Sequence, residues 1–199
     1  MFTGIISAVG QITTIDRGDD QATLTFATGS LDLSETGLGD SIACNGACLT
    51  VVDVSAEGFS AELSRETLEC TTFGELSTGA AITFEAALKL SDSLDGHLVT
   101  GHVDGTGAVR SVRDEGESLL LEIEAPAELA RYIARKGSVC VDGVSLTVNS
   151  VAEARFSVMI VPHTQTHTII ANYAPGTRVN LEVDLIARYL ERFLQYTDS

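Results

Sequence analysis

The chain of 199 residues has no long hydrophobic run and little positive charge. No apolar segment approaches the ~18 residues needed to cross a bilayer, and residues 1–6 lack the basic and apolar regions of a signal peptide. Only 12 lysines and arginines stand against 28 aspartates and glutamates, which gives a net charge of −16. Nucleic-acid binding needs clustered positive charge. These absences predict a cytoplasmic protein with neither a membrane nor a nucleic acid as partner.

Several chemical motifs are missing as well. The four cysteines form no C-x2-C pair, so we expect reduced thiols and no zinc site. Histidine spacings match no zinc finger, and no metal is expected. The string at 143–147 (GVSLT) lacks the second glycine of a G-x-S-x-G nucleophile elbow. The glycine-rich string at 101–107 lacks the Lys and Ser/Thr of a phosphate-binding loop. A serine hydrolase and a nucleotide-binding protein are therefore disfavoured.

What the chain does contain is one segment written twice, at an offset of 97 residues without a gap. Residues 2–6 (FTGII) recur as 99–103 (VTGHV), and residues 41–51 (SIACNGACLTV) recur as 138–148 (SVCVDGVSLTV). This period exceeds the ~20–50 residues of solenoid repeats, so it indicates a duplicated domain. We predict an N-terminal domain at 1–97, a C-terminal domain at 98–183 and a tail at 184–199. Two similar cavities suit a reaction between two similar molecules.

Each repeat is typical of an all-β domain. In the first half, segments rich in β-branched or alternating apolar residues predict strands at 9–15, 22–27, 41–44, 48–54, 59–63 and 80–85, with partners 97 residues on. Such strands favour a closed barrel or a sandwich. A helix is predicted between Pro126 and Gly137, a less regular one at 30–36, and a link between the domains at 87–97.

The tail departs from the repeat. Its apolar side chains recur at helical spacing, and charged side chains occupy the other face. This pattern predicts an amphipathic helix that either docks on its own barrel or pairs with copies of itself. The apolar positions are Ile186, Tyr189, Leu190, Phe193 and Leu194, and the charged ones are Arg188, Glu191 and Arg192.

The two repeats differ at positions that could carry chemistry. The offset of 97 pairs Cys48 with Ser145, Ile5 with His102, Ala87 with Asp184, and Gly39 with Lys136. The second half therefore has an imidazole, a carboxylate and an ammonium group that the first half lacks. General acid–base work would fall to His102, because the unperturbed pKa of histidine lies nearest neutrality. Strand alternation puts Cys48 with Thr50, and Ser145 with Thr147, on one face, which either binds a small heteroaromatic ligand or is simply a polar outer face.

Several strings resemble the riboflavin synthase family: residues 1–5 (MFTGI), 45–51 (NGACLTV), 96–103 (GHLVTGHV), 136–137 (KG) with 142–148 (DGVSLTV), and 162–164 (PHT). The resemblance covers nearly the whole chain. It implies an all-β-dominated fold of two tandem six-stranded Greek-key barrels with a C-terminal helix that forms a homotrimer. It also implies a transferase that moves a four-carbon unit between two molecules of 6,7-dimethyl-8-ribityllumazine. The products are riboflavin and 5-amino-6-ribitylaminouracil, and no cofactor is required.

The resemblance further implies site residues and partners. The active site forms where the N-terminal barrel of one subunit meets the C-terminal barrel of the next, and lumazine synthase is a further candidate partner. Chemistry is expected from Cys48, His102, Ser145, Thr147 and Asp184. The N-terminal pocket is expected to contain Gly4, Ile5, Ile6, Cys48, Leu49, Thr50, Glu62, Leu63, Ser64, Arg65, Glu66 and Thr67. The C-terminal pocket is expected to contain Gly101, His102, Val103, Lys136, Ser145, Leu146, Thr147, Val161, Pro162, His163, Thr164, Gln165 and Thr166.

The main alternative is a non-catalytic fluorescent protein of the same fold that holds a lumazine or a flavin. Such relatives are expected to lack the polar active-site residues and the trimer-forming helix pattern, and this sequence has both. His163 stands where some family members carry an acidic residue, and Ala47 where some carry a second cysteine. Neither of these positions is assigned to chemistry.

Overall fold

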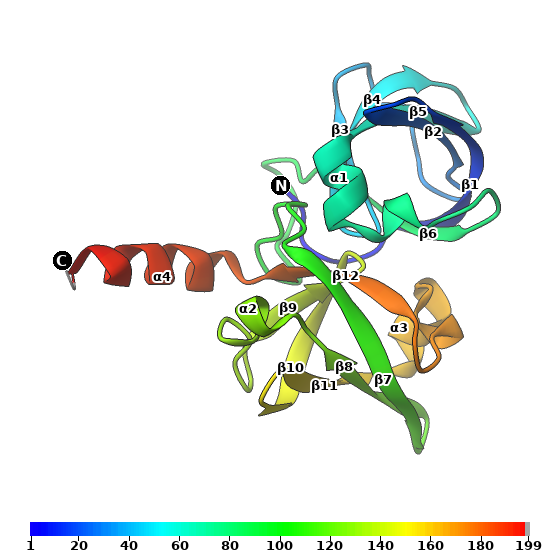
Figure 1. The fold of residues 1–199 in the computed structure, drawn as a ribbon. Helices are drawn as coiled ribbons and strands as arrows, with labels where there is room; N and C mark the ends of the chain where they lie inside the picture. The colour runs from blue at the N-terminus through cyan, green and yellow to red at the C-terminus, as the bar shows by residue number, and fades with distance from the viewer. Residues whose placement is uncertain (198–199) are drawn as a thin grey trace.

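The computed structural model describes residues 1–197, which form two closed, six-stranded antiparallel barrels with one long helix projecting from the second (Figure 1). The first barrel contains β1 (Ala8–Arg17), β2 (Gln21–Ala27), β3 (Ser41–Cys44), β4 (Ala47–Val54), β5 (Gly58–Ser64) and β6 (Ala81–Ala86). The second contains β7 (Gly105–Glu115), β8 (Ser118–Glu124), β9 (Ser138–Val141), β10 (Val144–Ala152), β11 (Arg155–Ile160) and β12 (Arg178–Val183). The predicted pair of barrels is confirmed.

The two barrels have the same strand order. Around the first barrel the order is β1-β2-β5-β4-β3-β6, and around the second it is β7-β8-β11-β10-β9-β12. Register shifts occur between Ile12 and Thr14 in β1, and the matching shift in β7 lies 97 residues on, between Val109 and Ser111. The shifts in β4 and β10 match in the same way. Because a bulge bends its strand and increases its twist, these repeated bulges help each sheet to close.

Alternation along the strands fills both barrels, but with different side chains. In β2 the inward positions are Ala22, Leu24 and Phe26, all buried. Phe26 belongs to a cluster of four phenylalanines in the first barrel, with ring centroids 5.0–6.3 Å apart, that also contains Phe59, Phe73 and Phe84. The second barrel packs mainly Val, Leu and Ile around Phe156. The barrels therefore share a backbone plan while their interiors differ.

Short helices follow β5 and β11 at matching places. These are α1 (Arg65–Cys70) with the 3-10 turn η1 (Thr72–Gly74), and α3 (Pro162–His167) with η2 (Ile170–Asn172). Ser64 caps α1 by accepting a hydrogen bond from the Thr67 amide at 3.2 Å. The sequence pattern does not predict α1 or α3, because six residues are too few to show a helical period.

The helix predicted between Pro126 and Gly137 is wrong in length, and the one at 30–36 is wrong. Only α2 (Ala127–Ala130) is α-helical, and residues 30–36 form turns and irregular backbone. Beyond α2, the amide of Ile133 bonds to the carbonyl three residues back at 3.2 Å, and Lys136 has φ of +67°. Residues 87–97 contain no strand or helix, as expected for a link.

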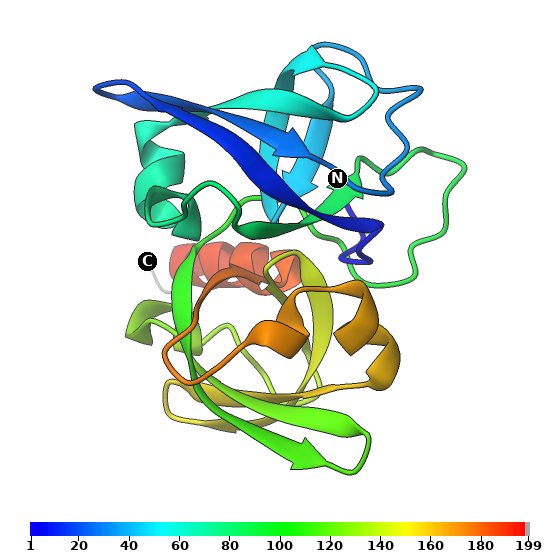
Figure 2. The same cartoon turned by 90° about the vertical axis from the view of Figure 1, so that its right-hand side faces the viewer.

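The long helix α4 (Leu185–Thr197) leaves the second barrel at the level of the junction between the barrels (Figures 1 and 2). The predicted tail extends to residue 199, and residues 198–199 lie outside the described part of the chain. Arg188 pairs with Asp104 at 2.8 Å, and Glu191 pairs with Arg131 at 3.0 Å. These ion pairs hold the charged face of α4 to the second barrel. Within residues 1–197, no helix is long and apolar enough to cross a membrane.

Candidate functional site

Two short segments cross between the barrels, and each contacts the opposite barrel beside Cys48 or Ser145. We call residues 2–6 the first arm and residues 99–103 the second arm. The arms pair antiparallel at Phe2 and Val99, with N···O distances of 2.8 and 3.1 Å. Each arm precedes its own barrel and then contacts the other. The Cys48 amide in β4 donates to the Gly101 carbonyl, and the Ser145 amide in β10 donates to the Gly4 carbonyl, both at 2.8 Å.

Glycine is required where each arm touches the opposite barrel. Gly101 has φ of +80°, and a Cβ added there would lie 2.5 Å from the Cys48 Cβ. Gly4 has φ of +77°, and a Cβ there would lie 2.6 Å from the Ser145 Cβ. Both the left-handed backbone and the close approach exclude a larger side chain without movement. The turns preceding Cys48 and Ser145 meet equally closely, because a Cβ on Gly46 would lie 2.6 Å from the Gly143 nitrogen.

The pocket of the first barrel is a cavity of about 250 Å³ beside Cys48. It is lined by Ala47, Cys48, Glu66, Thr67, Cys70, Thr71, Gly101, His102 and Val103. The structure thus brings together Cys48 and His102, two of the residues predicted to carry chemistry. A thiol, an imidazole and a carboxyl group share one small cavity, which gives it both nucleophilic and acid–base capacity.

The pockets predicted for the two arms must be exchanged. The second arm, with Gly101, His102 and Val103, lines the pocket of the N-terminal barrel. The first arm contacts Ser145 through Gly4, and Ile6 packs against the core of the second barrel. The prediction failed here because sequence position places each arm with the barrel that follows it, whereas the arms cross at Phe2 and Val99.

On the second barrel, Ser145 is paired with a histidine that the predicted site does not include. The Nδ1 of His97 lies 2.7 Å from the Ser145 Oγ, and the His97 amide donates to the Thr3 carbonyl at 3.1 Å. Burial lowers the pKa of His97, while the negative charge of Asp184 opposes that shift. Its Nε2 is buried without a hydrogen-bond partner among the described residues. A neutral imidazole with one nitrogen on a hydroxyl and the other unpaired can accept or deliver a proton.

The sequence contains a signal for His97, because it lies in the string at 96–103 that carries the family resemblance. Comparison of the two repeats does not reveal it, since the offset of 97 places its counterpart before residue 1. Asp184, which was predicted, accepts a hydrogen bond from the Ile186 amide at 2.9 Å and lies just before α4. Its carboxylate therefore accepts a hydrogen bond at the start of α4 and also acts electrostatically on His97.

The remaining predicted residues divide by their place on the barrels. Three leucines have side chains buried in the barrel cores, so only their backbone can face a ligand: Leu49, Leu63 and Leu146. Exposed or half-buried positions on the strands, arms and loops are Ile5, Thr50, Glu62, Ser64, Lys136 and Thr147. Arg65 points to the exposed surface, where it pairs with Glu69 at 2.9 Å.

The pseudo-symmetry also places the predicted residues around α3. The offset of 97 puts Ser145, His163 and Thr164 where Cys48, Glu66 and Thr67 line the first pocket. Val161, Pro162 and Thr166 are exposed, and Gln165 is partly buried. The rings of His163 and His167 stack with centroids 4.0 Å apart. By this offset the second barrel has two imidazoles, those of His163 and His167, where the first barrel has Glu66 and Cys70.

Comparison with known proteins gives the same duplicated pattern. The family model described as lumazine binding domain matches residues 3–87 and again residues 100–184. The chain is 45% identical over 194 residues to riboflavin synthase of Photobacterium phosphoreum, covering 98% of this chain and 89% of that protein. The chain belongs to the riboflavin synthase family. Riboflavin synthase of Mycobacterium bovis is 45% identical over 199 residues, covering 98% of both chains. That of Bacillus subtilis is 35% identical over 194 residues, covering 98% of this chain and 90% of that one.

Solved structures of LumP have the same fold as this chain. LumP complexed with riboflavin has a TM-score of 0.86 at 24% identity, covering 92% of this chain and 99% of that one. LumP complexed with 6,7-dimethyl-8-(1'-D-ribityl) lumazine has a TM-score of 0.83 at 23% identity with the same coverage. The resemblance read from the sequence and the predicted fold class are both confirmed.

Proposed function

We propose that this chain is an active riboflavin synthase, which transfers a four-carbon unit between two molecules of 6,7-dimethyl-8-ribityllumazine. The observation that carries the proposal is the pair of related but unequal pocket regions. One has Cys48 with His102 in a cavity of about 250 Å³, and the other has Ser145 paired with the partly buried His97 at 2.7 Å. Two similar sites bind two identical molecules, and their different side chains let one molecule react as donor and the other as acceptor.

The chemistry requires groups that move protons near both rings. One lumazine loses a proton from its C7 methyl group, and the resulting carbanion attacks the other molecule after a nucleophile adds at that molecule's C7. In our proposal His102, with Ser145 or Thr147, transfers these protons, and the neutral His97 orients the Ser145 hydroxyl. Holding both rings in reacting position removes much of the entropic cost of a bimolecular encounter, an effect worth up to roughly 7–11 kcal/mol in well-oriented systems.

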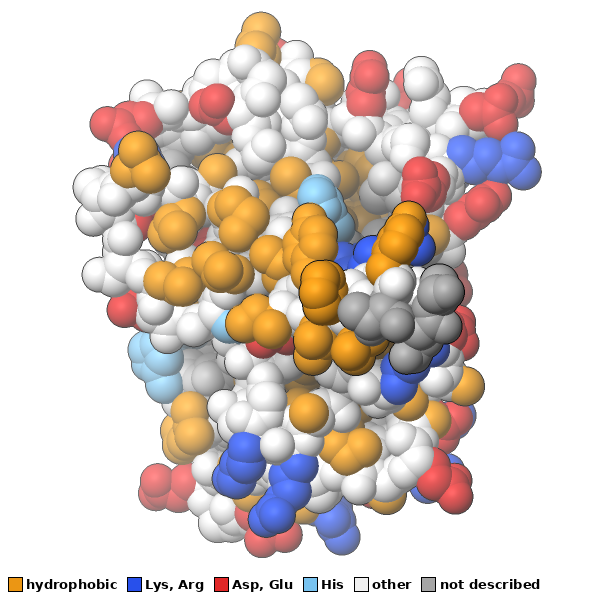
Figure 3. All heavy atoms as spheres, turned by 90° about the vertical axis from the view of Figure 1, so that its left-hand side faces the viewer, with side chains coloured by type: hydrophobic (Ala, Val, Ile, Leu, Met, Phe, Trp, Pro, Cys, Tyr) orange, Lys and Arg blue, Asp and Glu red, His pale blue; other side chains and the backbone are white. Residues whose placement is uncertain are grey.

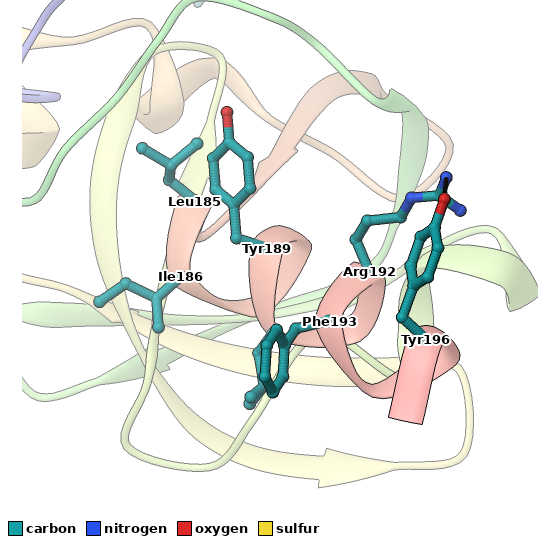
Figure 4. Close-up of a pocket in the computed structure, with 7 residues that line it drawn as sticks. Leu185, Ile186, Tyr189, Arg192, Phe193 and Tyr196 are labelled. Atoms are coloured by element: carbon teal, nitrogen blue, oxygen red, sulfur yellow. Dashed lines mark hydrogen bonds between the residues drawn. The ribbon is translucent and has the colours of Figure 1, made fainter. Parts of the chain in front are cut away.

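We propose that the working unit is a homotrimer assembled through α4. The apolar face of α4 is broadly exposed, with Ile186 71%, Tyr189 68% and Phe193 68% accessible. These side chains line an open groove along the helix (Figure 4). Figure 3 shows that hydrophobic side chains gather on the face of the molecule from which α4 projects. Burying such a patch against copies of itself is favourable at roughly 25 cal/mol per Å² of apolar area.

The trimer would let the N-terminal barrel (1–97) of one subunit face the C-terminal barrel (98–183) of the next, so that each reaction centre uses both pocket types. In this arrangement the tail at 184–199 is the assembly element. A cytoplasmic location and an association with lumazine synthase complete the proposal. The net charge of −16 is compatible with a dissolved protein of the cell interior.

The test mixes purified protein with the lumazine and follows the absorbance of the flavin. An enzyme consumes two lumazines for each riboflavin formed, and the variant Ser145→Ala reduces the rate. A protein that only holds a chromophore leaves the absorbance of the lumazine unchanged apart from a binding shift. That result would refute catalysis and favour the binding-protein alternative.

A further inference from the structure

Two buried glutamates hold the arms by matching sets of hydrogen bonds. Glu85 in β6 accepts from the Thr3 amide and hydroxyl, both at 2.6 Å, and from the Gly4 amide at 2.9 Å. Glu182 in β12 accepts from the Thr100 amide and hydroxyl, both at 2.7 Å, and from the Gly101 amide at 2.9 Å. We call each glutamate with its three hydrogen bonds to an arm a clamp. The two clamps have nearly the same geometry in both repeats.

Each clamp is strong because its carboxylate has little access to water. Glu85 is 5% exposed and Glu182 is 2% exposed. A carboxylate that is removed from water depends on the hydrogen bonds it receives, and such charge-assisted bonds are roughly twice as strong as neutral ones. Moving an arm away would leave a buried charge without its donors. The glutamates thus fix the arms to the barrels that carry β6 and β12.

Each arm that a glutamate holds also forms a hydrogen bond with the opposite barrel. Glu182 belongs to the second barrel, but the Gly101 that it holds accepts from the Cys48 amide of the first barrel at 2.8 Å. The Thr100 hydroxyl also accepts from the His102 amide at 3.3 Å, so the clamp reaches the residue that lines the pocket beside Cys48.

Glu85 is connected in the reverse direction. It belongs to the first barrel and holds Thr3 and Gly4. The Gly4 carbonyl accepts from the Ser145 amide at 2.8 Å, and the Thr3 carbonyl accepts from the His97 amide at 3.1 Å. Neither glutamate lines the cavity beside Cys48. Each one acts through the backbone of an arm and not by contact with a ligand.

We propose that Glu182 is a positioning residue for the pocket of the N-terminal barrel, and Glu85 for the pocket region of the C-terminal barrel. The assignment is crossed, because each glutamate sets the site of the barrel to which it does not belong. Its meaning for catalysis rests on the proposed riboflavin synthase activity. The crossed positioning itself can be tested without measuring riboflavin formation.

The experiment compares Glu182→Gln with Glu85→Gln in the full chain. The amide side chain keeps the size of glutamate but replaces one acceptor oxygen with an NH2 group, which cannot accept from an arm amide. In Glu182→Gln the second arm loosens over Cys48, and in Glu85→Gln the first arm loosens beside Ser145. The pseudo-symmetry makes each variant the matched control for the other.

The first readout is the rate at which iodoacetamide alkylates Cys48 in the native protein, measured by peptide mass spectrometry. Cys44 and Cys140 are buried, and glutathione added to the same sample is the reference for reagent reactivity, because Cys70 lines the same cavity as Cys48. We expect Glu182→Gln to raise the Cys48 rate at least fivefold relative to glutathione, and Glu85→Gln to leave it within twofold of the unmodified protein. Equal effects of the two variants, or none from Glu182→Gln, would overturn the crossed assignment.

The second readout is the titration of the His97 ring followed by NMR. Glu85→Gln is expected to shift its midpoint by at least half a pH unit, whereas Glu182→Gln leaves it in place. A role limited to stability would move both readouts in both variants. If Glu182→Gln does not fold, Thr100→Val tests the same clamp more gently, since it removes the hydroxyl contacts to Glu182 and to the His102 amide but keeps both amide bonds to Glu182. The Cys48 rate must then rise in that variant, or the proposal fails.

Riboflavin formation is measured separately on the same samples. If the unmodified protein forms no riboflavin but the crossed pattern appears, the proposed function is wrong and the positioning role stands. If riboflavin forms but Cys48 and His97 respond without regard to which glutamate is changed, the positioning role is wrong and the proposed function stands.

Discussion

The substitution Asp142→Asn should stabilise the protein in a way that depends on pH. Asp142 lies in the turn between β9 and β10, fully buried at the junction of the barrels. Its Oδ1 accepts from the Asn180 amide at 2.7 Å, and the Tyr173 hydroxyl donates to its Oδ2. The first repeat has Asn45 at the matching position, where the side-chain oxygen accepts from the Thr83 amide at 2.8 Å. The fold therefore already contains a neutral version of this site.

The size of the pH-dependent change in the free energy of unfolding follows from the pKa of Asp142. Desolvation by burial raises its pKa from 3.8 to about 7, although the hydrogen bonds from Tyr173 and Asn180 act in the opposite direction. Between these two values the folded protein binds a proton that the unfolded chain has released. The free energy of unfolding therefore falls as the pH rises from about 4 to about 7, by roughly 1.4 kcal/mol per unit.

Asparagine at position 142 removes this dependence. We expect the stability of Asp142→Asn relative to the unmodified protein to increase by about 3 kcal/mol between pH 5 and pH 8, with nearly all of the change below pH 7. Urea unfolding at one fixed protein concentration measures the difference. The exposed Asp114, changed to Asn, controls for the loss of one negative charge on an acidic chain. Parallel stability profiles for Asp142→Asn and the unmodified protein would show that Asp142 does not titrate as a buried acid.

Three further outcomes test other parts of the structure. Gly101→Ala should lower the free energy of unfolding by roughly 3 kcal/mol or more, because the new Cβ would lie 2.5 Å from the Cys48 Cβ. Gly39→Ala should lower it by only about 1 kcal/mol, because Gly39 also has a positive φ but no atom lies within 4 Å of its added Cβ. Equal costs in thermal unfolding would contradict the close contact. Ser145→Ala should lower the rate of riboflavin formation by roughly 10²–10⁴-fold with unchanged circular dichroism, and an unchanged rate would remove Ser145 from the chemistry. Leu190→Asp should give monomers by light scattering and abolish turnover, and a trimer that persists would exclude α4 as the assembly element.

The barrels could be predicted from the sequence because their determinants are local and repeated. Alternating apolar residues, with turn residues such as Asn45 and Gly46 between them, predict all six strands of the first barrel. The offset of 97 transfers each strand to the second barrel. The helices α1 and α3 escaped prediction because they are too short to show a period. The helix expected after Pro126 ends already at Ala130, and the chain continues in turns and irregular backbone to Lys136, which has a positive φ.

The site was harder to predict because its geometry comes from contacts between distant residues. Cys48 and His102 could be named from the differences between the repeats, but not that they share one cavity. Their proximity depends on the crossing of the arms at Phe2 and Val99, and no local pattern encodes which barrel an arm will touch. His97 escaped for a related reason, since it has no counterpart in the first repeat.

The crossing of the arms also affects how the chain folds during synthesis. The first barrel leaves the ribosome before residues 99–103 exist, so until then the Cys48 amide lacks the carbonyl that it bonds in the finished protein. The second barrel, in contrast, emerges when residues 2–6 are already available. Each half thus completes backbone hydrogen bonds of the other, and loss of one half removes those contacts. We therefore expect the two repeated units to unfold together.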